Sequence, residues 1–496
     1  MENKKRLLVF IAMIFLLLLR QGRGNNIQIQ NVTIASWEMN EDYVLVQFDL
    51  SWENSFRDEV NWDAAWVFVK YQLQGSSEWQ HAWLGTTAAE HTVPAGYTCT
   101  VGSTTIDTIN RGMGVFIHRS ANGSGNTSLA DVQIRWVYGA NGVADGAPLT
   151  LKVFAIEMVY VPQGPFYLGD ADADLYYNFY TYGTSGPYLV TGEGEIPLGQ
   201  TTGYLWAPNY VEAGALPAAF PKGYDAFYCM KYEISQGQWV DFFNTLADSQ
   251  KTTRDMTSYV APLWGKYSDN VEWRNTISII SGFATCTTPD RTCNYLCWSD
   301  GTAYADWAGL RPMTELEYEK ACRGTLPVVD DEFAWGSADI IGAAAISGDE
   351  DGTEIISTAG ANCRYNYIPL AGGDGGDGPL RGGIFARSAT TREAAGSSYY
   401  GIMELSGNVW ELAVNISNAA GKGYTGLHGD GSLDDTGMSD VANWPVYNST
   451  AISYRGGAWD GDASAQRVSN RYLAGLPSFD RDGRNGFRCV RTAPSS

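Results

Sequence analysis

The sequence predicts an α+β protein in which an all-β sandwich precedes a loop-rich region with a few short helices. Before residue 157, apolar and polar residues alternate in short runs, a pattern typical of strands with one buried face. From Val159 onwards the chain is rich in Gly, Tyr and Asp and has few helical windows. The predicted division is a signal peptide at 1–24, a β-sandwich accessory domain at 25–157 and a second domain at 158–496.

The composition indicates compact, loop-rich domains with aromatic cores. The 496 residues include 56 Gly, 29 Tyr and 17 Trp, and only 18% of them are charged. The formal net charge of −22 opposes binding to nucleic acid or to an anionic membrane surface. We therefore expect no nucleic-acid partner. The acidity favours solubility outside the cell or, alternatively, affinity for divalent cations.

The N-terminus has the features of a secretory signal peptide. Lys4, Lys5 and Arg6 precede an apolar run at residues 7–19, which is short for a membrane-spanning helix of about 20 residues. We therefore expect an exported protein of the periplasm, cell envelope or extracellular space, and not an integral membrane protein after signal removal. Arg20 and Arg23 crowd the cleavage region, so an uncleaved anchor is the alternative.

Eight cysteines are spread along the chain. Export permits disulfides, and any two of Cys286, Cys293 and Cys297 are candidates for a pair because they crowd one polar stretch. Their spacing does not fit a zinc site, since no Cys-x-x-Cys pair and no nearby histidine are present. We expect Cys322 and Cys489 to be buried apolar fillers.

Four runs predict strands of the sandwich, and no long helix is expected beside them. In each run every second residue is apolar, and Gly, Asn and Ser mark the turns between runs. The apolar positions are Val44, Val46, Phe48, Leu50 and Trp52; Val67, Val69, Tyr71 and Leu73; Val132, Ile134, Trp136 and Tyr138; and Leu149, Leu151 and Val153.

Two helices are predicted from apolar spacing in the second domain. One begins after Ser235 as N-cap, and the other spans about residues 299–307 and ends at Gly309. We expect their aromatic stripes to belong to the core. The stripe of the first helix consists of Trp239, Phe242, Phe243 and Leu246.

A third helix has clear start and stop signals. Thr314 and Glu317 have the spacing of a capping box, and Gly324 ends the helix. Met313 is expected to pack against Tyr318 as a hydrophobic staple.

Residues 330–455 are predicted to be mostly loop. Three segments there are dense in Gly and Asp, namely 347–352, 372–378 and 429–435. Loops this long are uncommon in a compact domain unless they are functional or stabilised by a metal.

Five phrases follow one another in a fixed order between about residues 158 and 492. They are Val159-Tyr160-Val161-Pro162 continuing to Gly169; Phe227-Tyr228-Cys229-Met230 continuing to Ser235; Arg311-Pro312-Met313-Thr314-Glu315; Gly407-Asn408-Val409-Trp410-Glu411-Leu412; and Arg455-Gly456-Gly457-Ala458-Trp459 with Arg467, Arg471 and Gly486-Phe487-Arg488-Cys489-Val490. Together they resemble the formylglycine-generating enzyme family, also called sulfatase-modifying factors. The resemblance implies a C-type-lectin-like fold for this region.

The resemblance also implies a copper site that this sequence lacks. In catalytic members of the family, two cysteines follow the Arg-Gly-Gly segment and hold copper, which is used with O₂ to convert a substrate cysteine to formylglycine. Thiolates are the ligands that Cu(I) prefers, and residues 460–466 contain none. No copper is therefore expected. An oxidoreductase of the formylglycine-generating type with a diverged site is the alternative.

A related branch of the superfamily uses nonheme iron held by three histidines, mostly from a separate helical domain. This chain has only His81, His91, His118 and His428, no His-x-x-x-His pair and no such helical domain. We therefore expect no iron, and ordinary surface or loop positions for the histidines.

For calcium, the resemblance implies a structural site at the Gly-Asn-x-Trp-Glu turn. Carried onto this chain, its ligands are Glu404, the carbonyls of Gly407 and Val409, and Glu411, a set of hard oxygen donors. The alternative is that Glu411 pairs with an arginine and Asn408 caps a turn.

A second calcium site is implied near Asn362 and Cys363. A carboxylate such as Asp374 or Asp377 would complete it.

Two further groups have alternative interpretations. Arg455, Arg467, Arg471 and Arg488 suit an anionic ligand, but we favour internal bridges to loop carbonyls and carboxylates. The aromatic stretch of Tyr176, Tyr177, Phe179, Tyr180 and Tyr182 is either an exposed platform for a sugar or protein, or core filling.

The sequence thus predicts an exported, non-catalytic binding or structural module of the cell envelope, stiffened by calcium. Its partner is expected to be a protein or glycan outside the cytoplasm. The alternatives are the diverged metal-dependent oxidoreductase and a carbohydrate-binding lectin-like module.

Overall fold

The computed structural model describes residues 26–171, 177–208, 211–258, 265–386, 391–478 and 480–494. The signal peptide predicted at 1–24 and Tyr176 lie outside these ranges. Within them strands dominate and helices are few and short, in agreement with the α+β class. No helix of the described ranges is long and apolar enough to cross a membrane.

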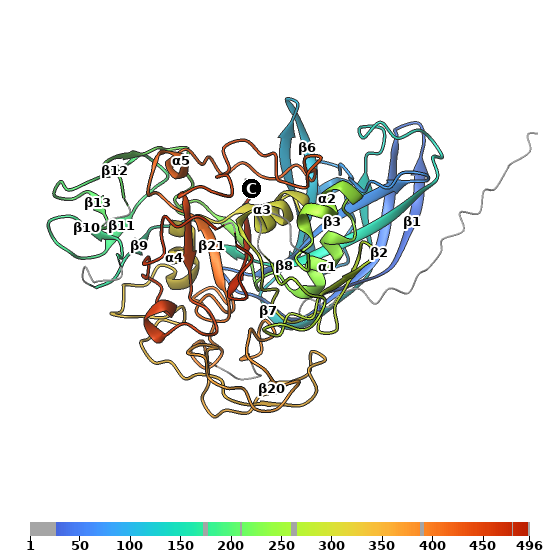
Figure 1. Cartoon of the computed structure of the whole chain (residues 1–496). Helices are drawn as coiled ribbons and strands as arrows, with labels where there is room; N and C mark the ends of the chain where they lie inside the picture. The colour runs from blue at the N-terminus through green and yellow to red at the C-terminus, as the bar shows by residue number, and fades with distance from the viewer. Residues whose placement is uncertain are drawn as a thin grey trace, which may run out of the picture.

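The N-terminal part of the chain forms two facing sheets, seen together in Figure 1. The period-2 prediction for the second strand is confirmed, because the side chains from Val44 to Trp52 are alternately buried. One sheet has the order β1-β2-β7, from β1 (Gln28–Glu38), β2 (Tyr43–Arg57) and β7 (Gly123–Trp136). The facing sheet contains β3 (Asp63–Leu73), β4 (Gln80–His81), β5 (Tyr97–Ile106), β6 (Ile109–Arg119) and β8 (Leu149–Val161), and a 3-10 turn, η1 (Ala88–Glu90), connects β4 to β5.

This facing sheet continues into the C-terminal region. Its order is β18-β24-β15-β8-β3-β6-β5, with β4 also paired to β3. β8 pairs with β3 along one edge and with β15 along the other. The boundary predicted between residues 157 and 158 therefore falls inside β8. The added strands are β15 (Phe227–Met230), β18 (Arg311–Pro312) and β24 (Cys489–Thr492).

β3 is buried on both faces, whereas its alternation predicts a single buried face. Val67 and Val69 pack inside the sandwich, while Trp66 and Phe68 on the opposite face join the core beneath the helices. A central strand covered on both sides has no solvent-facing side chains. The prediction of one buried face was therefore wrong for β3.

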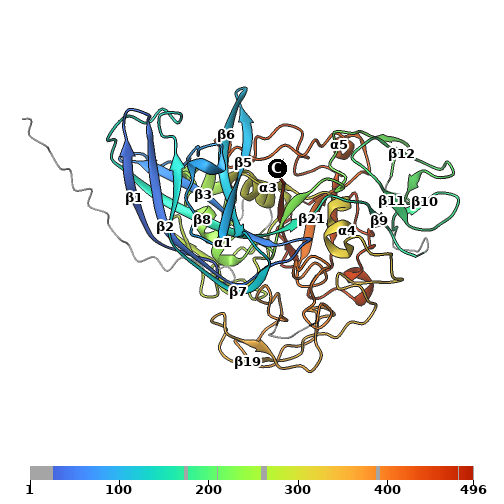
Figure 2. The ribbon, with the colours of Figure 1, turned by 180° about the vertical axis from the view of Figure 1, so that it is seen from behind.

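α1 and α3 pack against this second face of the sheet, whereas Tyr318 and Ala321 of α4 pack in a separate core with Val159 and Val161. α1 and α3 lie beside β3 and β8 in both views (Figures 1 and 2), and their aromatic side chains share one core with Phe68. The predicted role of the aromatic stripes as core is confirmed. The helices are α1 (Gln236–Phe243), α2 (Asp248–Arg254), α3 (Trp298–Trp307), α4 (Glu315–Arg323) and α5 (Ala419–Lys422).

The predicted helix signals are confirmed at α1 and α4. The hydroxyl of Ser235 accepts the N–H of Gln238 at 3.2 Å, which caps α1. In α4 the capping box is complete, since the Thr314 hydroxyl accepts the Glu317 N–H at 3.1 Å and the Glu317 carboxylate accepts the Thr314 N–H at 3.0 Å. α4 ends at Gly324, which has a φ of 68°.

Short sheets and long loops make up the rest of the chain. The segment with β10 to β13 lies at the end of the molecule opposite β1 in both views, and the loops around β19 and β20 form a separate projection (Figures 1 and 2). The strands are β9 (Phe166–Leu168), β10 (Tyr180–Thr181), β11 (Tyr188–Val190), β12 (Ile196–Leu198), β13 (Leu205–Trp206), β14 (Gly214–Leu216), β16 (Ser278–Ile280), β17 (Phe283–Thr285), β19 (Ile346–Ser347), β20 (Ile355–Ile356), β21 (Trp410–Val414), β22 (Ile452–Arg455) and β23 (Asn485–Gly486), with a second 3-10 turn, η2 (Ala463–Gln466).

All eight cysteines are free thiols, so the pairing considered for Cys286, Cys293 and Cys297 does not occur. Cys293 is buried in the apolar core, and the Cys297 thiol donates to Asp300 at 3.1 Å. The thiols of Cys293 and Cys297 thus have different neighbours and are not bonded to each other. As predicted, Cys322 and Cys489 are buried.

Candidate functional site

The turn at Gly407 is built from residues with left-handed backbone. Gly407 has a φ of 95° and Asn408 a φ of 68°. A Cβ atom on Gly407 would lie 2.4 Å from the Cys363 sulfur and 2.9 Å from the Arg364 carbonyl, so only glycine fits here. The structure thus brings the segment of Cys363 into direct contact with the turn.

Three buried glutamates surround this turn. Glu411 binds the Arg488 guanidinium at 2.6 Å, and Glu404 accepts the Gly383 N–H at 2.7 Å. Glu233 accepts the Asn408 amide at 2.7 Å and the Val409 N–H at 3.3 Å. Burial raises the pKa of Glu404 to about 7, and it also raises the pKa values of Glu411 and Glu233. Burial is the main cause of these pKa shifts, and the Arg488 guanidinium opposes it at all three carboxylates.

Two oxygens of this cluster have no hydrogen-bond partner. Glu404 Oε2 and Glu411 Oε2 are both buried and unbonded, and buried polar atoms normally have partners. They belong to the two residues that the sequence marks as side-chain ligands of calcium. The donor set thus fits a calcium ion, to which Glu404 and Glu411 would contribute oxygens together with the Gly407 and Val409 carbonyls.

The contacts expected from the alternative interpretation, in which Glu411 pairs with an arginine and Asn408 caps the turn, also occur in part. Glu411 does pair with Arg488, but through Oε1. Asn408 holds the turn by donating to Glu233 and by accepting the Leu380 N–H at 2.7 Å. The arginine therefore occupies one oxygen of Glu411 and leaves the other available.

The surroundings of the second predicted calcium site fit an ion poorly. The Asn362 side-chain oxygen accepts the Ile341 N–H at 2.9 Å, and the Cys363 thiol donates to the Ser406 carbonyl at 3.3 Å. Asp374 pairs with Arg274 at 2.6 Å and with Arg291 at 2.7 Å, while Asp377 lies 3.5 Å from Arg364. Arginines thus supply the positive charge that the Gly- and Asp-rich loop at 372–378 needs.

The loop after the Arg-Gly-Gly segment is closed by a glutamine. Gln466 is fully buried, and its amide donates to the carbonyls of Ala458, Gly461 and Asp462 at 3.2, 3.2 and 3.1 Å. Ala463 packs against a small cluster that contains Cys363, and burial raises the pKa of that thiol. One protonated thiol near the loop does not provide the thiolate pair that Cu(I) requires.

The C-terminal arginines have internal roles, as favoured from the sequence. Arg488 donates to the carbonyls of Met230 and Met403 at 2.8 and 2.7 Å in addition to Glu411. Arg455 bonds to Glu319 at 2.6 Å, and Arg471 bonds to Glu315 at 2.7 Å. These three arginines are completely buried. The fourth arginine, Arg467, pairs with the partly exposed carboxylate of Asp331 at 2.5 Å.

The four histidines bond to the backbone at separate places. His81 contacts the Met113 carbonyl at 2.7 Å, His91 the Gly85 carbonyl at 3.1 Å and His118 the Arg119 carbonyl at 3.0 Å. His428 accepts the Thr492 N–H at 3.1 Å. His81, His91 and His118 are buried rather than at the surface, and in each of them a ring nitrogen bonds to a backbone carbonyl.

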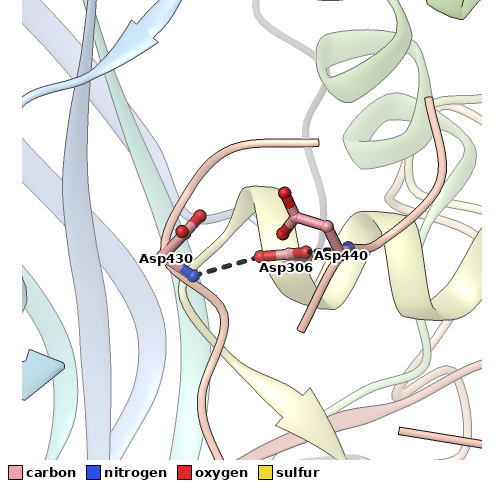
Figure 3. A group of neighbouring side chains, drawn as sticks. All are labelled: Asp306, Asp430 and Asp440. Carbon is pink, nitrogen blue, oxygen red and sulfur yellow. Dashed lines mark hydrogen bonds between the residues drawn. The ribbon is translucent and has the colours of Figure 1, made fainter. Parts of the chain in front are cut away.

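A carboxylate group that the sequence analysis missed lies beside α3 (Figure 3). Oxygens of Asp306, Asp430 and Asp440 lie within 4.8 Å of one another. Asp306 accepts the N–H groups of Asp430 at 3.1 Å and Asp440 at 3.3 Å, so it fastens the loop to the helix. The many Gly and Asp residues at 429–435 indicated a special role for this loop, but no pattern in the sequence around Asp306 indicates that it meets the loop.

The aromatic stretch near residue 180 divides between core and surface. Phe179 is fully buried beneath the Arg471 guanidinium at 3.9 Å. Tyr180 and Tyr182 are half-buried and stack with ring centroids 6.5 Å apart. Neither interpretation of the stretch therefore holds for all of its described residues.

Comparison with known proteins supports the resemblance. The family described as "Sulfatase-modifying factor enzyme 1-like domain" matches residues 150–493. The formylglycine-generating enzyme of Bos taurus is 29% identical over 161 residues, which are 29% of this chain and 41% of that protein. The enzyme of Thermomonospora curvata is 25% identical over 264 residues, covering 51% of this chain and 69% of that protein.

The matches to the two mammalian enzymes span less than half of their length, with 41% of the bovine and 45% of the mouse protein covered. A segment of 48 residues is 46% identical to the enzyme of Streptomyces coelicolor. Since the family match covers more than half of the chain and includes both the Gly407 turn and the Arg-Gly-Gly segment, the chain belongs to the sulfatase-modifying factor family of formylglycine-generating enzyme-like proteins.

Proposed function

We propose that this chain is an exported, non-catalytic binding or structural member of its family, with a C-type-lectin-like scaffold stiffened by calcium. The observation that carries the proposal is the loop at 460–466, where a buried glutamine closes the segment that holds copper-binding cysteines in catalytic members. An amide nitrogen bonded to three carbonyls offers no soft ligand to Cu(I). The partner is a protein or glycan outside the cytoplasm.

The test of the non-catalytic role is a metal analysis combined with an activity assay. Purified protein is analysed for copper and iron and is then incubated with Cu(I), O₂ and a cysteine-containing peptide. We expect neither metal in stoichiometric amount and no aldehyde on the peptide. Stoichiometric copper together with aldehyde formation would instead establish the diverged oxidoreductase.

The calcium proposal is supported by the two unbonded oxygens of Glu404 and Glu411. A cation that binds only the folded state stabilises it in proportion to the logarithm of its concentration. The melting temperature is therefore expected to fall on chelation and to recover when calcium is added back.

A variant and its control locate the calcium effect. Glu404→Gln should abolish the response of the melting temperature to calcium. Glu393→Gln is the matched control, because Glu393 is exposed and, within the described contacts, its carboxylate accepts a hydrogen bond only from the Ser337 hydroxyl. An unchanged calcium response in Glu404→Gln would refute this site.

Export is proposed from the basic and apolar pattern of residues 4–19. Fractionation of cells that express the full chain, followed by N-terminal sequencing of the exported protein, tests it. We expect a mature N-terminus close to residue 25. Full-length protein confined to the cytoplasm would contradict the proposal.

A further inference from the structure

Two half-exposed aromatic rings lie over a buried tryptophan on the surface of the family domain. Trp273 is 44% exposed and Tyr367 is 48% exposed, while Trp459 beneath them is only 2% exposed. The ring centroids of Trp273 and Tyr367 lie 5.1 and 5.5 Å from that of Trp459, and 6.3 Å from each other. The two exposed rings are inclined at 68° to each other and both rest on Trp459, and we call this group the aromatic platform.

Both exposed rings are held on backbone that bulky residues avoid. Trp273 has a φ of 43° and Tyr367 a φ of 48°, and the residue adjacent to each is also left-handed. Such conformations are unfavourable for large side chains and are concentrated at functional sites.

Buried arginines next to the two rings hold this strained backbone. Arg274 follows Trp273 in the chain, pairs with Asp374 at 2.6 Å and donates to the Pro379 carbonyl at 2.9 Å. Arg364 lies three residues before Tyr367 and donates to the Gly378 carbonyl at 3.1 Å. The loops that present the rings are therefore pre-organised, which lowers the entropy lost on binding.

Close packing also fixes the platform from below. The Trp459 indole N–H donates to the Gly483 carbonyl at 3.0 Å. A Cβ atom on Gly483 would lie 2.7 Å from the Trp273 ring, so the close approach of that ring to the chain requires glycine. The platform residues are therefore fixed by packing and hydrogen bonding to the family domain.

Polar groups surround the aromatic surface. Arg484, directly after Gly483, is 49% exposed at its side chain and pairs with Asp482 at 2.6 Å and more distantly with Asp460 at 4.0 Å. Partial desolvation and then the carboxylates of Asp377 and Asp460 raise the pKa of the Tyr367 hydroxyl. The platform thus has a rim of hydrogen-bonding groups.

The charges of this rim limit the class of ligand. Asp482 is neutralised by Arg484, and Asp377 lies 3.5 Å from Arg364, so the rim offers little free negative charge to a cationic peptide. The net charge of the chain, −22, opposes an anionic ligand such as nucleic acid or a sulfated glycan. A neutral ligand with one apolar face and many hydroxyl groups matches both the rings and the rim.

We propose that Trp273 and Tyr367, supported from below by Trp459, form a stacking platform for the pyranose rings of a neutral glycan. The apolar C–H face of the sugar lies on the aromatic surface, and its hydroxyl groups bond to Asp460, Arg484 and the Tyr367 hydroxyl. The proposal rests on the non-catalytic binding role proposed above and supplies its ligand class. It involves no group transfer.

The test is direct binding of neutral oligosaccharides to the purified full chain. Hexaoses of glucose with α- and β-linkages, mannose, xylose and N-acetylglucosamine are titrated by calorimetry, with tryptophan fluorescence as the second readout. We expect at least one of these probes to bind and to shift the emission of the exposed Trp273. Trp273→Ala and Asp460→Asn should each weaken that binding at least tenfold.

A matched pair of variants separates binding from folding. Tyr367→Gly removes a ring but also relieves left-handed strain, so we expect weaker glycan binding with an equal or higher melting temperature. Phe283→Ala is the control, because Phe283 is a similarly exposed ring (45%) on the β16–β17 hairpin that does not belong to the platform, and its loss should leave binding unchanged.

Three results would overturn the proposal. They are the absence of binding to every neutral probe, binding that persists in both Trp273→Ala and Asp460→Asn, and preferential binding of peptides or acidic glycans. None of these results depends on the copper and aldehyde assay. The experiments can therefore refute the glycan proposal without refuting the non-catalytic role, and the reverse also holds.

Discussion

Gln466 fills the loop that follows the Arg-Gly-Gly segment. Its amide is buried and bonds to three carbonyls of the loop. Backbone carbonyls of a tight, buried loop need donors, and here one side chain supplies them. The same position therefore serves the architecture of the loop and excludes a soft metal ligand from it.

This geometry predicts that two cysteines introduced into the loop at 460–466 can form a Cu(I) site. A Cβ atom on Gly461 would lie 3.0 Å from the Gln466 amide nitrogen, so Gly461→Cys combined with Gln466→Cys places two thiols close together. We expect the reduced double variant to bind one Cu(I) per chain in a competition assay with a chromogenic chelator. Each single variant is the control and should not bind, because one thiolate is insufficient. Equal binding by the unmodified chain would contradict the prediction.

Lys70 is a buried lysine on β3 that the sequence analysis did not single out. It is fully buried and donates to the Gly431 carbonyl at 2.6 Å. Burial lowers its pKa to about 7, although the carboxylates of Asp306 and Asp430 oppose this shift. Lys70 lies on the face of β3 that packs against the helices, and not on the face inside the sandwich. The helices come from a distant part of the sequence, so nothing near Lys70 in the chain indicates that it is buried.

The lowered pKa predicts a pH dependence of stability. Above pH 7 the folded chain has lost the Lys70 proton, whereas the unfolded chain keeps it up to about pH 10.4. The free energy of unfolding therefore rises with pH across this window, by up to about 1.4 kcal/mol per pH unit from this group. Lys70→Met should remove that contribution, measured by urea unfolding at pH 7 to 10. Lys251→Met on α2 is the control and should keep the slope of the unmodified chain.

At the scale of elements, α4 shows what start and stop signals can and cannot predict. Its cap, its staple and its final glycine follow from short-range spacing, and the structure has all three. Its acidic residues are buried, however, and meet arginines from other parts of the chain. Glu315 bonds to Arg471, Glu317 to Arg311 and Glu319 to Arg455. An acidic helix normally indicates a solvent-exposed face, so these pairs were not predictable from the helix alone.

Removing one of these arginines should be strongly destabilising. Arg455→Met removes the closer cation of the buried Glu319 carboxylate and leaves only Arg323 at 3.5 Å, and we expect a loss of about 3–5 kcal/mol in the free energy of unfolding. Arg467→Met is the matched control, because the Arg467–Asp331 pair is partly exposed, and it should cost no more than about 1 kcal/mol. Denaturant unfolding of the two variants gives both values. Equal effects would show that burial does not set the strength of these pairs.

At the scale of the whole molecule, the two predicted domains share structure. β8 bridges them within one sheet, and Trp66 from β3 donates its indole N–H to the Ala308 carbonyl at 2.9 Å. Lys231, near the end of β15, pairs with Asp63 and Glu157 at 3.2 Å each. The sandwich therefore covers apolar and charged groups of the family domain that would otherwise be exposed.

This predicts that the family domain does not fold by itself. A chain of residues 158–496 keeps only the last four residues of β8 beside β15 and loses β3 and the cover for the helices, so we expect it to aggregate or to give no cooperative transition. The chain of residues 25–496 should unfold in a single transition by circular dichroism and calorimetry. A soluble 158–496 fragment with the melting temperature of the longer chain would refute this coupling.

The sequence by itself determined what depends on neighbours along the chain. It predicted the period-2 strands of the sandwich, the caps of α1 and α4, the family phrases and the absence of sulfur from residues 460–466. Each of these depends on local spacing or on residue identity alone.

Only the tertiary structure decided which groups lose contact with water and which distant residues meet. It buried both faces of β3, paired the acids of α4 with arginines, and left one oxygen of Glu404 and one of Glu411 without a partner. It also placed Trp273 and Tyr367 over Trp459, although almost 100 residues separate each from the next. Desolvation and contact between remote segments set these energies, and neither can be read from a local pattern.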